Sequence, residues 1–402
     1  MARLFNGEVV LVQGGMNIVG GVQHIRDAIL AEVQGVAGPE VAEALRAAGL
    51  VNLHKVLTAK QLNTLHGRVT PIMVERSPAV TEALTRTLFG RRKFWINRNV
   101  ALRFLTPNTM MKDNYELLKR KTGKLVQHGP HHDYWQGVAL NALNLWIAIE
   151  RVDRGNAMII NAERWGDILP RDGEHVSHDQ KLGVPIVTAC DAGDIILFHS
   201  QHLHGGILNR TDETRIVIST RVAMSAPMHP RLGGGTVYVP AFIVRGGSKR
   251  LAAAFALLER LRPINLLRRI EMHIVRRRGK GRPGDENLRV RLFDGVLKRH
   301  WFPRIADHGI APDATDEPPP RTALDGQIIA IGKNRIRVTS QGRTFELSRR
   351  CTHQGGDMAC GYLREGKIHC PLHDQPFDLE TGQAEGPGAG LAPLKVHETA
   401  DV

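Results

Sequence analysis

Apolar residues follow two different periods along the chain. In the first third, and again between residues 245 and 304, they recur every three or four positions, which predicts amphipathic helices. Gly35, Gly38 and Pro39 interrupt the first of these regions, and Pro263 divides the second into two helices. The apolar positions of the second region are Leu251, Phe255, Leu258, Leu261, Leu266, Leu267 and Ile270. We therefore expect helices on both sides of a central region that has a different pattern.

The central region, from Asn97 to Met224, contains short apolar runs that alternate with turn residues. One run covers residues 195–198, and a second run at 215–222 is rich in β-branched side chains. Short segments of this kind favour antiparallel strands, and several of them in succession predict a sandwich or jelly roll.

A second β-rich region follows a proline-rich, acidic stretch at 311–320, which is typical of a semi-rigid linker. Residues 328–338 and 343–347 alternate apolar and polar positions around a turn at 340–342. This alternation predicts a small antiparallel domain at the end of the chain. The fold class expected for the whole chain is thus β-dominated α+β, with a jelly roll and helical additions first and a small antiparallel β domain last.

Charge adds a feature that the hydrophobic pattern does not show. The 402 residues include 54 Lys and Arg against 40 Asp and Glu, a net charge of +14. Residues 245–304 contain 17 Lys and Arg but only 5 Asp and Glu, so this segment carries most of the excess. Two interpretations fit this basic segment: a solvated helical face, or a surface that binds an anionic partner such as an anionic membrane. Nucleic acid is not expected, because no binding module or aromatic stacking platform accompanies the charge.

Composition also limits the cellular setting. No run of eighteen apolar residues occurs, so no transmembrane helix is expected. The first fifteen residues have too short an apolar stretch for a secretory signal, and Glu8 interrupts it. Four cysteines are too few for a disulfide scaffold in a chain of this length, which favours a reducing cytoplasm.

Two short motifs near the end of the chain each offer one thiolate and one imidazole. They are Cys351-x-His353 and Cys370-x2-His373, with sixteen residues between them. Such a set can hold a [2Fe–2S] cluster, in which one iron takes both sulfurs and the other takes both histidines. A structural Cys2His2 zinc site is the alternative, although zinc fingers usually place both cysteines before both histidines.

The segments CTHQGG and CPLHDQPFDLETG resemble those of Rieske ferredoxin-like domains over the whole region. The resemblance implies a [2Fe–2S] cluster held by Cys351, His353, Cys370 and His373. Some Rieske proteins carry a disulfide between the two loops, but Gly356 and Leu372 occupy the corresponding positions here. Cys360 is then expected to have no part in the cluster.

A second group of metal-binding side chains lies in the central region. His131 and Asp133 are two residues apart, so in a strand they would share a face and could share one metal ion. A third ligand must come from elsewhere, and His199, His202 and His204 are the candidates. Arg215 follows His204 by eleven residues and begins an apolar run.

Residues 97–224 resemble the phytanoyl-CoA dioxygenase family of iron(II)/2-oxoglutarate oxygenases. The resemblance rests on His131-x-Asp133, on His204 with Arg215, and on the surrounding segments LWIAI, GD, FH and NRT. It implies that His131, Asp133 and His204 bind Fe(II), while Arg215 binds the distal carboxylate of 2-oxoglutarate. Two imidazoles and a carboxylate leave positions open on iron for a chelating co-substrate and O2.

The remaining polar and aromatic residues of this region have simpler interpretations. We expect His132 to point away from the metal, His199 to pack and His128 to lie in a loop. His202 competes with His204 for the metal, and Ser219 is a candidate to assist Arg215. Tyr134 and Trp135 are candidate walls of the pocket.

These resemblances divide the chain into four parts. Residues 1–244 form the expected oxygenase domain, 245–310 a basic helical extension, 311–323 the linker and 324–402 the Rieske domain. A Rieske domain is unexpected beside a 2-oxoglutarate oxygenase, because the oxidation of 2-oxoglutarate already supplies two electrons.

Three functional hypotheses follow. The first is a 2-oxoglutarate-dependent hydroxylase of a small-molecule or lipid-like C–H bond, in which the cluster keeps the iron reduced. The second is a monooxygenase that uses O2 and electrons from NAD(P)H through a reductase, without 2-oxoglutarate. The third is a redox or oxygen sensor that forms no product. A homo-oligomer is compatible with each of them.

Overall fold

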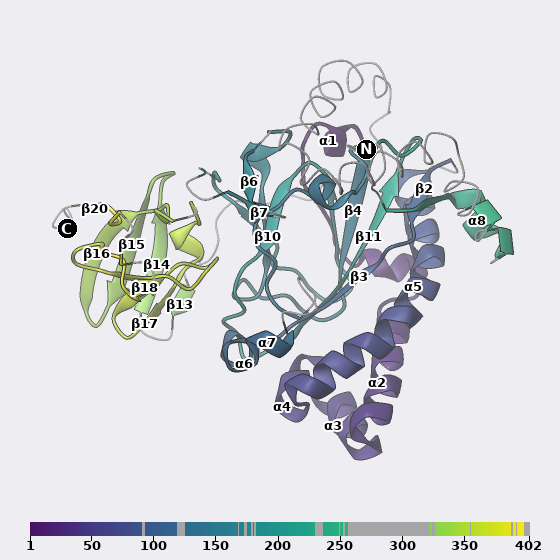
Figure 1. Cartoon of the computed structure of the whole chain (residues 1–402), viewed down its shortest axis with the longest axis horizontal. Helices are drawn as coiled ribbons and strands as arrows, with labels where there is room; N and C mark the ends of the chain where they lie inside the picture. Colours follow the sequence, from purple (N-terminus) through teal and green to yellow (C-terminus); the bar gives the residue numbers. More distant parts are fainter. Residues whose placement is uncertain are drawn as a thin grey trace, which may run out of the picture.

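The computed structural model describes residues 1–90, 93–118, 125–167, 169–172, 175–177, 180, 182–229, 236–248, 250–251, 254–255, 321–323, 326–353, 355–386, 389–390 and 392–397. Two β structures lie side by side, and the helices of the first third cover the far side of the larger one (Figure 1). The predictions for most of the basic segment, for Pro263 and for the linker at 311–320 lie outside the described residues.

Helices dominate the first ninety residues, as the period predicts. The α-helices described are α1 (Ala2–Phe5), α2 (Gln23–Ala37), α3 (Pro39–Ala48), α4 (Leu53–Val56), α5 (Ala59–Phe89), α6 (Asn108–Asp113), α7 (Tyr115–Leu118) and α8 (Ala241–Arg245). The 3-10 helices described are η1 (Gly15–Val19), η2 (Leu50–Asn52), η4 (Asp133–Gln136), η5 (Ala162–Arg164) and η7 (Met358–Cys360). Gly38 and Pro39 separate α2 from α3 as expected, whereas Gly35 lies inside α2.

The larger sheet is antiparallel, in the order β1-β9-β4-β11-β2-β12, and β3 also pairs with β11. Its strands are β1 (Val10–Val12), β2 (Trp95–Asn97), β3 (Ala101–Leu105), β4 (Ala142–Ala148), β9 (Ile195–His199), β11 (Arg215–Ala223) and β12 (Tyr238–Pro240). Every residue of β4, β9 and β11 is buried, because both faces of the sheet are covered. One face packs on the helices through residues such as Leu145, Leu197 and Ile218.

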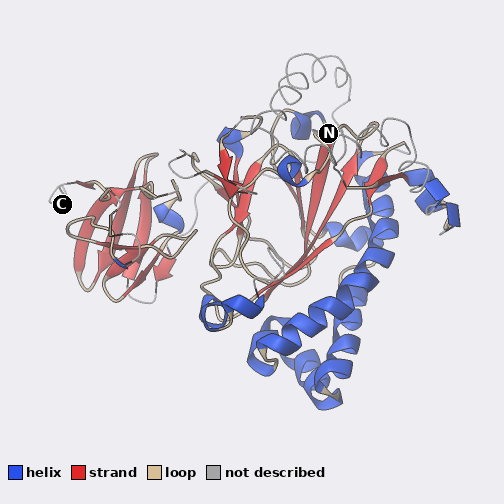
Figure 2. Ribbon diagram, in the orientation of Figure 1, coloured by secondary structure: helices blue, strands red, loops and turns tan. Residues whose placement is uncertain are grey.

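The other face of the larger sheet looks toward a smaller antiparallel sheet in the order β10-β5-β8 (Figure 2). The strands of the smaller sheet are β5 (Met158–Asn161), β8 (Ile186–Val187) and β10 (Leu203–Gly206), and a short β6 (Arg171–Asp172) and β7 (His175–Val176) hairpin lies nearby. Two facing antiparallel sheets with added helices confirm the predicted jelly-roll class.

The terminal domain contains two antiparallel sheets, in the orders β13-β14-β15-β16-β20 and β17-β18-β19. Their strands are β13 (Arg321–Ala323), β14 (Gly326–Ile331), β15 (Arg335–Ser340), β16 (Arg343–Ser348), β17 (Tyr362–Arg364), β18 (Lys367–His369), β19 (Pro376–Asp378) and β20 (Val396–His397). The stretch at 328–338 is therefore two strands rather than one alternating segment. Gly332, with a φ of 69°, makes the turn between them in a conformation that glycine adopts without strain.

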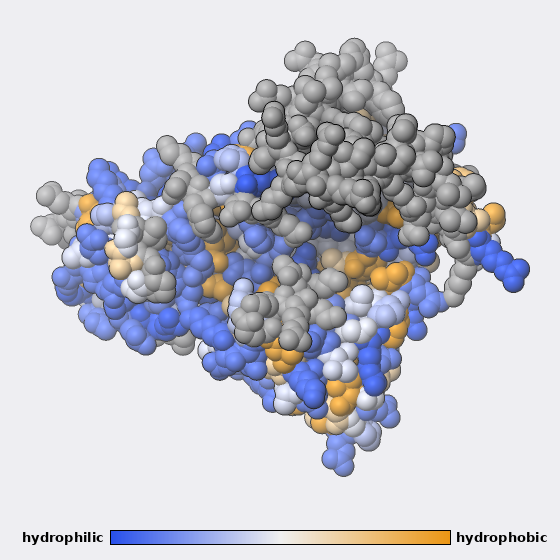
Figure 3. All heavy atoms as spheres, viewed as in Figure 1, coloured by the Kyte–Doolittle hydropathy of each residue, from blue (hydrophilic) through white to orange (hydrophobic). Residues whose placement is uncertain are grey.

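A single cluster of buried apolar side chains continues from the smaller sheet into the terminal domain. It includes Ile160 and Leu203 of the first domain together with Ile336, Leu372 and Phe377 of the second. Hydrophilic side chains cover most of the visible outer face of the terminal domain (Figure 3). Among the described residues, no helix is long and apolar enough to span a bilayer.

Candidate metal centres

Backbone pairing brings His131 and His204 together. His204 lies on β10, and the two residues exchange backbone hydrogen bonds of 2.8 and 3.0 Å across an isolated bridge. His131 takes part in strand pairing, and Asp133, two residues later, begins η4. His132 between them is extended, with φ of −98° and ψ of 136°, so the side chains of His131 and Asp133 point to the same side, as their spacing predicts.

The three side chains converge on one point. The Nε2 atoms of His131 and His204 lie 4.0 and 3.9 Å from Oδ1 of Asp133. The Nδ1 atoms hydrogen-bond instead to the carbonyl oxygens of Gly129 and His202, at 2.8 and 3.0 Å. This arrangement places the proton on Nδ1 and leaves Nε2 free as a ligand.

The donor set fits the metal that the sequence implies. The ligand atoms of His131, Asp133 and His204 all lie within 4.8 Å of one another, and Nε2 of His131 is buried with no hydrogen-bond partner among the described residues. Burial lowers the pKa of both His131 and His204, so both imidazoles are neutral and able to donate a lone pair. Two neutral nitrogens and one carboxylate match a non-haem Fe(II) site.

Asp133 has two partners that the sequence analysis did not identify. Arg221 donates from Nη2 to Oδ1 at 2.8 Å and from Nε to Oδ2 at 3.3 Å, and Asn144 donates to Oδ2 at 2.7 Å. Although burial favours the neutral acid, the positive charge of Arg221 holds the pKa of Asp133 well below its usual range. The carboxylate is thus ionised and fixed in orientation.

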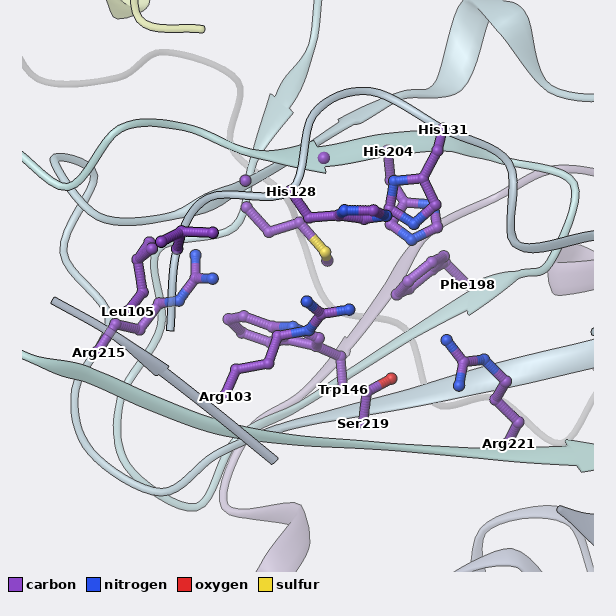
Figure 4. Close-up of a pocket in the computed structure, with 14 residues that line it drawn as sticks. Arg103, Leu105, His128, His131, Trp146, Phe198, His204, Arg215, Ser219 and Arg221 are labelled. Carbon is purple, nitrogen blue, oxygen red and sulfur yellow. The ribbon is translucent and has the colours of Figure 1, made fainter. Parts of the chain in front are cut away.

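A cavity lies between the two sheets beside these ligands (Figure 4). Its lining residues are Arg103, Leu105, Val126, His128, His131, Trp146, Met158, Phe198, His204, Gly205, Gly206, Arg215, Ser219 and Arg221. Three guanidinium groups thus face one cavity. Only Arg221 has a carboxylate partner within 4 Å among the described residues.

Arg215 is anchored at its end of the cavity. Its Nη1 donates to the carbonyl oxygen of Asn156 at 2.7 Å, and its guanidinium lies 5.7 Å from the ring centre of Trp146. Burial, followed by repulsion from Arg103, lowers the pKa of Arg215 to about 9. Burial and repulsion from Arg221 lower the pKa of Arg103 to about 10. Each lowered pKa means that the charged form of the guanidinium is destabilised in this site. A bound anion would reduce this destabilisation.

Strand register explains why these arginines share the cavity. Arg103 on β3 pairs with Val217 on β11, and Ser219 pairs with Trp146 on β4, so alternate residues of the three strands face inward. Arg221 continues the inward row of β11. A charged residue in an otherwise apolar run was the sequence signal that could have identified Arg221.

Ser219 lines the cavity but does not lie beside Arg215. The two residues are four positions apart on β11, which separates their Cα atoms by about 13 Å. Ser219 lies beside Trp146 and faces the end of the cavity nearer Arg221 (Figure 4). The expectation that it assists Arg215 is therefore corrected.

The other histidines of the region are buried around the ligands. His202 points its Nε2 to the carbonyl oxygen of Gly7 at 2.9 Å, which removes it as a competitor of His204 in this conformation. His199 packs edge-on against Phe5, and His132 stacks on Tyr134.

His128 lies in a loop but also lines the cavity, with its ring centre 4.1 Å from that of His131. Tyr134 and Trp135, the two aromatic candidates for the pocket wall, pack in the core beside His132 and do not line the cavity.

The second centre lies in the terminal domain. Ligand atoms of Cys351, Cys370 and His373 lie within 4.8 Å of one another, and Sγ of Cys351 is 3.6 Å from Nε2 of His373. The ring of His353 stacks on that of His373, with 4.3 Å between the ring centres. A hydrogen bond with Cys370 lowers the pKa of Cys351 to about 4, so a thiolate forms readily there.

The four side chains fit a binuclear cluster better than a single zinc ion. Both sulfurs lie together and both imidazoles are stacked together, which matches one iron with two sulfurs and one with two nitrogens. The side chain of Cys370 fits against Gly356 because glycine has no Cβ atom. A Cβ atom at position 356 would lie 2.9 Å from Sγ of Cys370. No disulfide joins any of the four cysteines, all of which lie in the described residues, and Cys360 lies outside the ligand group.

Comparison with known proteins agrees with this geometry. Residues 91–217 match the sequence model described as phytanoyl-CoA dioxygenase (PhyH), and residues 310–395 match the one described as Rieske [2Fe-2S] domain. The ferredoxin component of the naphthalene 1,2-dioxygenase system of Pseudomonas putida is 34% identical over 64 residues, which are 15% of this chain and 62% of that protein. The ferredoxin component of the naphthalene 1,2-dioxygenase/salicylate 5-hydroxylase systems of Ralstonia sp. is 32% identical over 63 residues, which are 15% and 61% of the two chains. The chain thus spans less than two thirds of these relatives.

Two solved structures are also similar in part. The non-heme alpha-ketoglutarate-dependent epimerase SnoN from nogalamycin biosynthesis is 17% identical, with a TM-score of 0.29, and covers 55% of this chain and 81% of its own. The non-heme monooxygenase ThoJ is 16% identical, with a TM-score of 0.32, and covers 59% of this chain and 83% of its own.

Proposed function

Because the chain joins a domain of the phytanoyl-CoA dioxygenase family to a Rieske [2Fe–2S] domain, we propose that it is a non-haem iron oxygenase that uses 2-oxoglutarate. It hydroxylates, or otherwise oxidises, a C–H bond of a small-molecule or lipid-like substrate with O2. One observation carries the proposal: two of the three metal-binding side chains, His131 and His204, line a cavity together with two guanidinium groups that have no carboxylate partner among the described residues.

Fe(II) at His131, Asp133 and His204 would supply the activation of O2, and a cluster at Cys351, His353, Cys370 and His373 would supply single electrons. The chain itself positions these groups. Arg221 and Asn144 hold the carboxylate of Asp133 ionised and oriented. Trp146 and Phe198 line the cavity with apolar surface, which limits access of water to the reacting atoms.

The charge of the cavity supports 2-oxoglutarate as the co-substrate. The three arginines carry three positive charges against the single negative charge of Asp133. Buried cations are unfavourable without partners, and guanidinium groups are the side chains best shaped to bind carboxylates. A dicarboxylate that chelates the metal at one end and meets Arg215 at the other would offset this excess, and Arg103 lines the cavity between them (Figure 4).

Replacing Arg215 tests the co-substrate directly. Loss of a charge-assisted hydrogen bond of about 1.5–3 kcal/mol should weaken 2-oxoglutarate binding by about 10–100-fold in Arg215→Ala. Calorimetry on anaerobic protein with Mn2+ in place of iron measures the affinity without turnover. Arg46→Ala, on the exposed face of α3, is the control and should bind like the unaltered chain. Equal affinity in both variants would remove Arg215 from the co-substrate site.

A stoichiometry assay separates the proposal from its alternatives. Turnover of a candidate substrate library should release one succinate for each oxidised product. The 2-oxoglutarate-independent alternative uses NAD(P)H through a reductase and releases no succinate; the contact of the cluster loops with residues beside the iron ligands favours such electron delivery. A sensor forms no product, so loss of product together with metal in His204→Ala would exclude it.

A further inference from the structure

Both cluster loops of the Rieske domain contact the oxygenase domain. The amide nitrogen of Leu208 donates to the carbonyl oxygen of Pro371 at 2.9 Å, and Nε2 of Gln127 donates to the carbonyl oxygen of Leu372 at 2.5 Å. Pro371 and Leu372 lie between the ligands Cys370 and His373 and are buried. The second loop contributes Gly355, where an added Cβ atom would lie 2.3 Å from the backbone oxygen of Gln180.

The residues that receive these loops adjoin the other metal centre. Gln127 precedes His128, whose ring packs on the ring of His131 with 4.1 Å between the centres. The carbonyl oxygen of His128 accepts a hydrogen bond of 2.8 Å from Gly206, which follows His204 on β10. A continuous chain of contacts therefore joins Leu372, beside the cluster ligand His373, to the iron ligand His131.

Polar contacts fix the orientation of the two domains around this face. Lys112 forms an ion pair with Asp374, the residue after His373. Arg210 donates to the carbonyl oxygen of Gly361, and its guanidinium lies 5.5 Å from the ring centre of Tyr362. Opposite charges and a cation–π contact on the rim favour one register of docking.

We propose that this face is the electron-transfer interface, that it forms within one chain, and that Gln127 and His128 are the positioning residues that connect the cluster to the iron site. The inference rests on the proposed function. With both groups bound, one electron would pass from the reduced [2Fe–2S] cluster held by Cys351, His353, Cys370 and His373 to one ferric ion held by His131, Asp133 and His204, and no bond of the chain would form or break. Figure 1 shows the Rieske domain beside the β6, β7 and β10 side of the jelly roll, as this role requires.

Gly355→Ala tests the interface, and Gly386→Ala is its matched control. The two glycines have φ values of 66° and 63°, so the backbone strain is alike. A Cβ atom at Gly355 meets the oxygenase domain, whereas one at Gly386 meets nothing within 4 Å. In the full chain, pulse reduction followed by cluster absorbance should show electron transfer slowed by about tenfold or more in Gly355→Ala only.

A second readout reports proximity without turnover. Co2+ at the triad should shorten the relaxation of the electron paramagnetic resonance signal of the reduced cluster, while Zn2+ should not. Gly355→Ala should lose this effect and retain the cluster spectrum and potential. If Gly355→Ala impairs cluster assembly, Gln127→Leu tests the same face from the other domain, with the exposed Gln34→Leu as its control. Unchanged relaxation and transfer rate in Gln127→Leu would overturn the assigned path.

Mixing two variants decides whether docking is within one chain. A chain with Cys351→Ser cannot form the cluster, and a chain with His131→Ala cannot bind iron. Their mixture should show no electron transfer at any concentration, and recovery of transfer on mixing would refute the intramolecular arrangement. If the unaltered chain itself never transfers an electron although the Co2+ effect is present, the electron supply of the proposed function fails instead.

Discussion

At the residue scale, the carboxylate of Asp133 depends on one guanidinium. Asp133 is fully buried, and a buried ionised group is strongly unfavourable without a paired charge. Arg221 supplies that charge and donates one hydrogen bond to each carboxylate oxygen. Asn144 donates a further hydrogen bond to Oδ2. The ligand that the sequence motif identifies is therefore usable only because of a residue 88 positions later in the chain.

We expect Arg221→Met to weaken metal binding by about 10–100-fold, the range found when partners of metal ligands are removed. The loss follows because burial then favours the neutral acid over the carboxylate. Titration of the anaerobic chain with Mn2+ measures the affinity. Arg221→Lys keeps the charge and should lose less, so equal losses in both variants would show that charge is not the cause.

At the scale of elements, the distance between β10 and the segment before Asp133 sets the geometry of the metal site. A Cβ atom at Gly205 would lie 2.8 Å from backbone atoms of Gly129 and Pro130. This close approach lets His131 and His204 exchange backbone hydrogen bonds. Glycine is needed at 205 because two backbones meet there, and its φ is not positive.

Gly205→Ala should therefore push β10 away from His131. We expect a loss of about 1–3 kcal/mol in unfolding free energy, as in other overpacked sites, together with weaker Mn2+ binding. Gly206→Ala is the neighbouring control, because its nearest contact would be an ordinary 3.7 Å. Denaturant unfolding and metal titration of both variants provide the comparison. Similar losses in both would point to strand propensity rather than to the close approach.

At the scale of the whole molecule, the cluster and the docking of the two domains are linked. The loops that hold the cluster ligands also supply Pro371, Leu372 and Gly355 to the contact with the oxygenase domain. Loops that hold the ligands of a metal centre become less ordered when the metal centre is absent, because metal binding is coupled to their folding. Cluster assembly should therefore stabilise the interface.

Hydrogen exchange can measure this link at one amide. The amide of Leu208 is protected by Pro371 of the Rieske domain, whereas that of His204 is protected by His131 of its own domain. In the double variant Cys351→Ser/Cys370→Ser, protection at Leu208 should fall by about tenfold or more, while that at His204 should remain. Retained protection at Leu208 would mean that the domains dock without the cluster.

Local patterns in the sequence identified much of this protein. The spacing of His131, Asp133, His204 and Arg215, and the two Cys-x-His type motifs, lie within short segments, so their chemistry can be recognised one segment at a time. The apolar runs at 195–198 and 215–222 likewise predicted β9 and β11, since burial on both faces leaves few polar positions in a strand.

The tertiary structure alone decided which distant side chains meet. Arg103, Asn144 and Arg221 lie on the metal-binding face of the sheet because β3, β4 and β11 pair in one register, and a shift of one residue would turn them toward the helices. Gln127 and Gly355 are unremarkable in the sequence and gain their roles only where the two domains touch. Pairing and docking are non-local, so no pattern within a single segment encodes the partner of these residues.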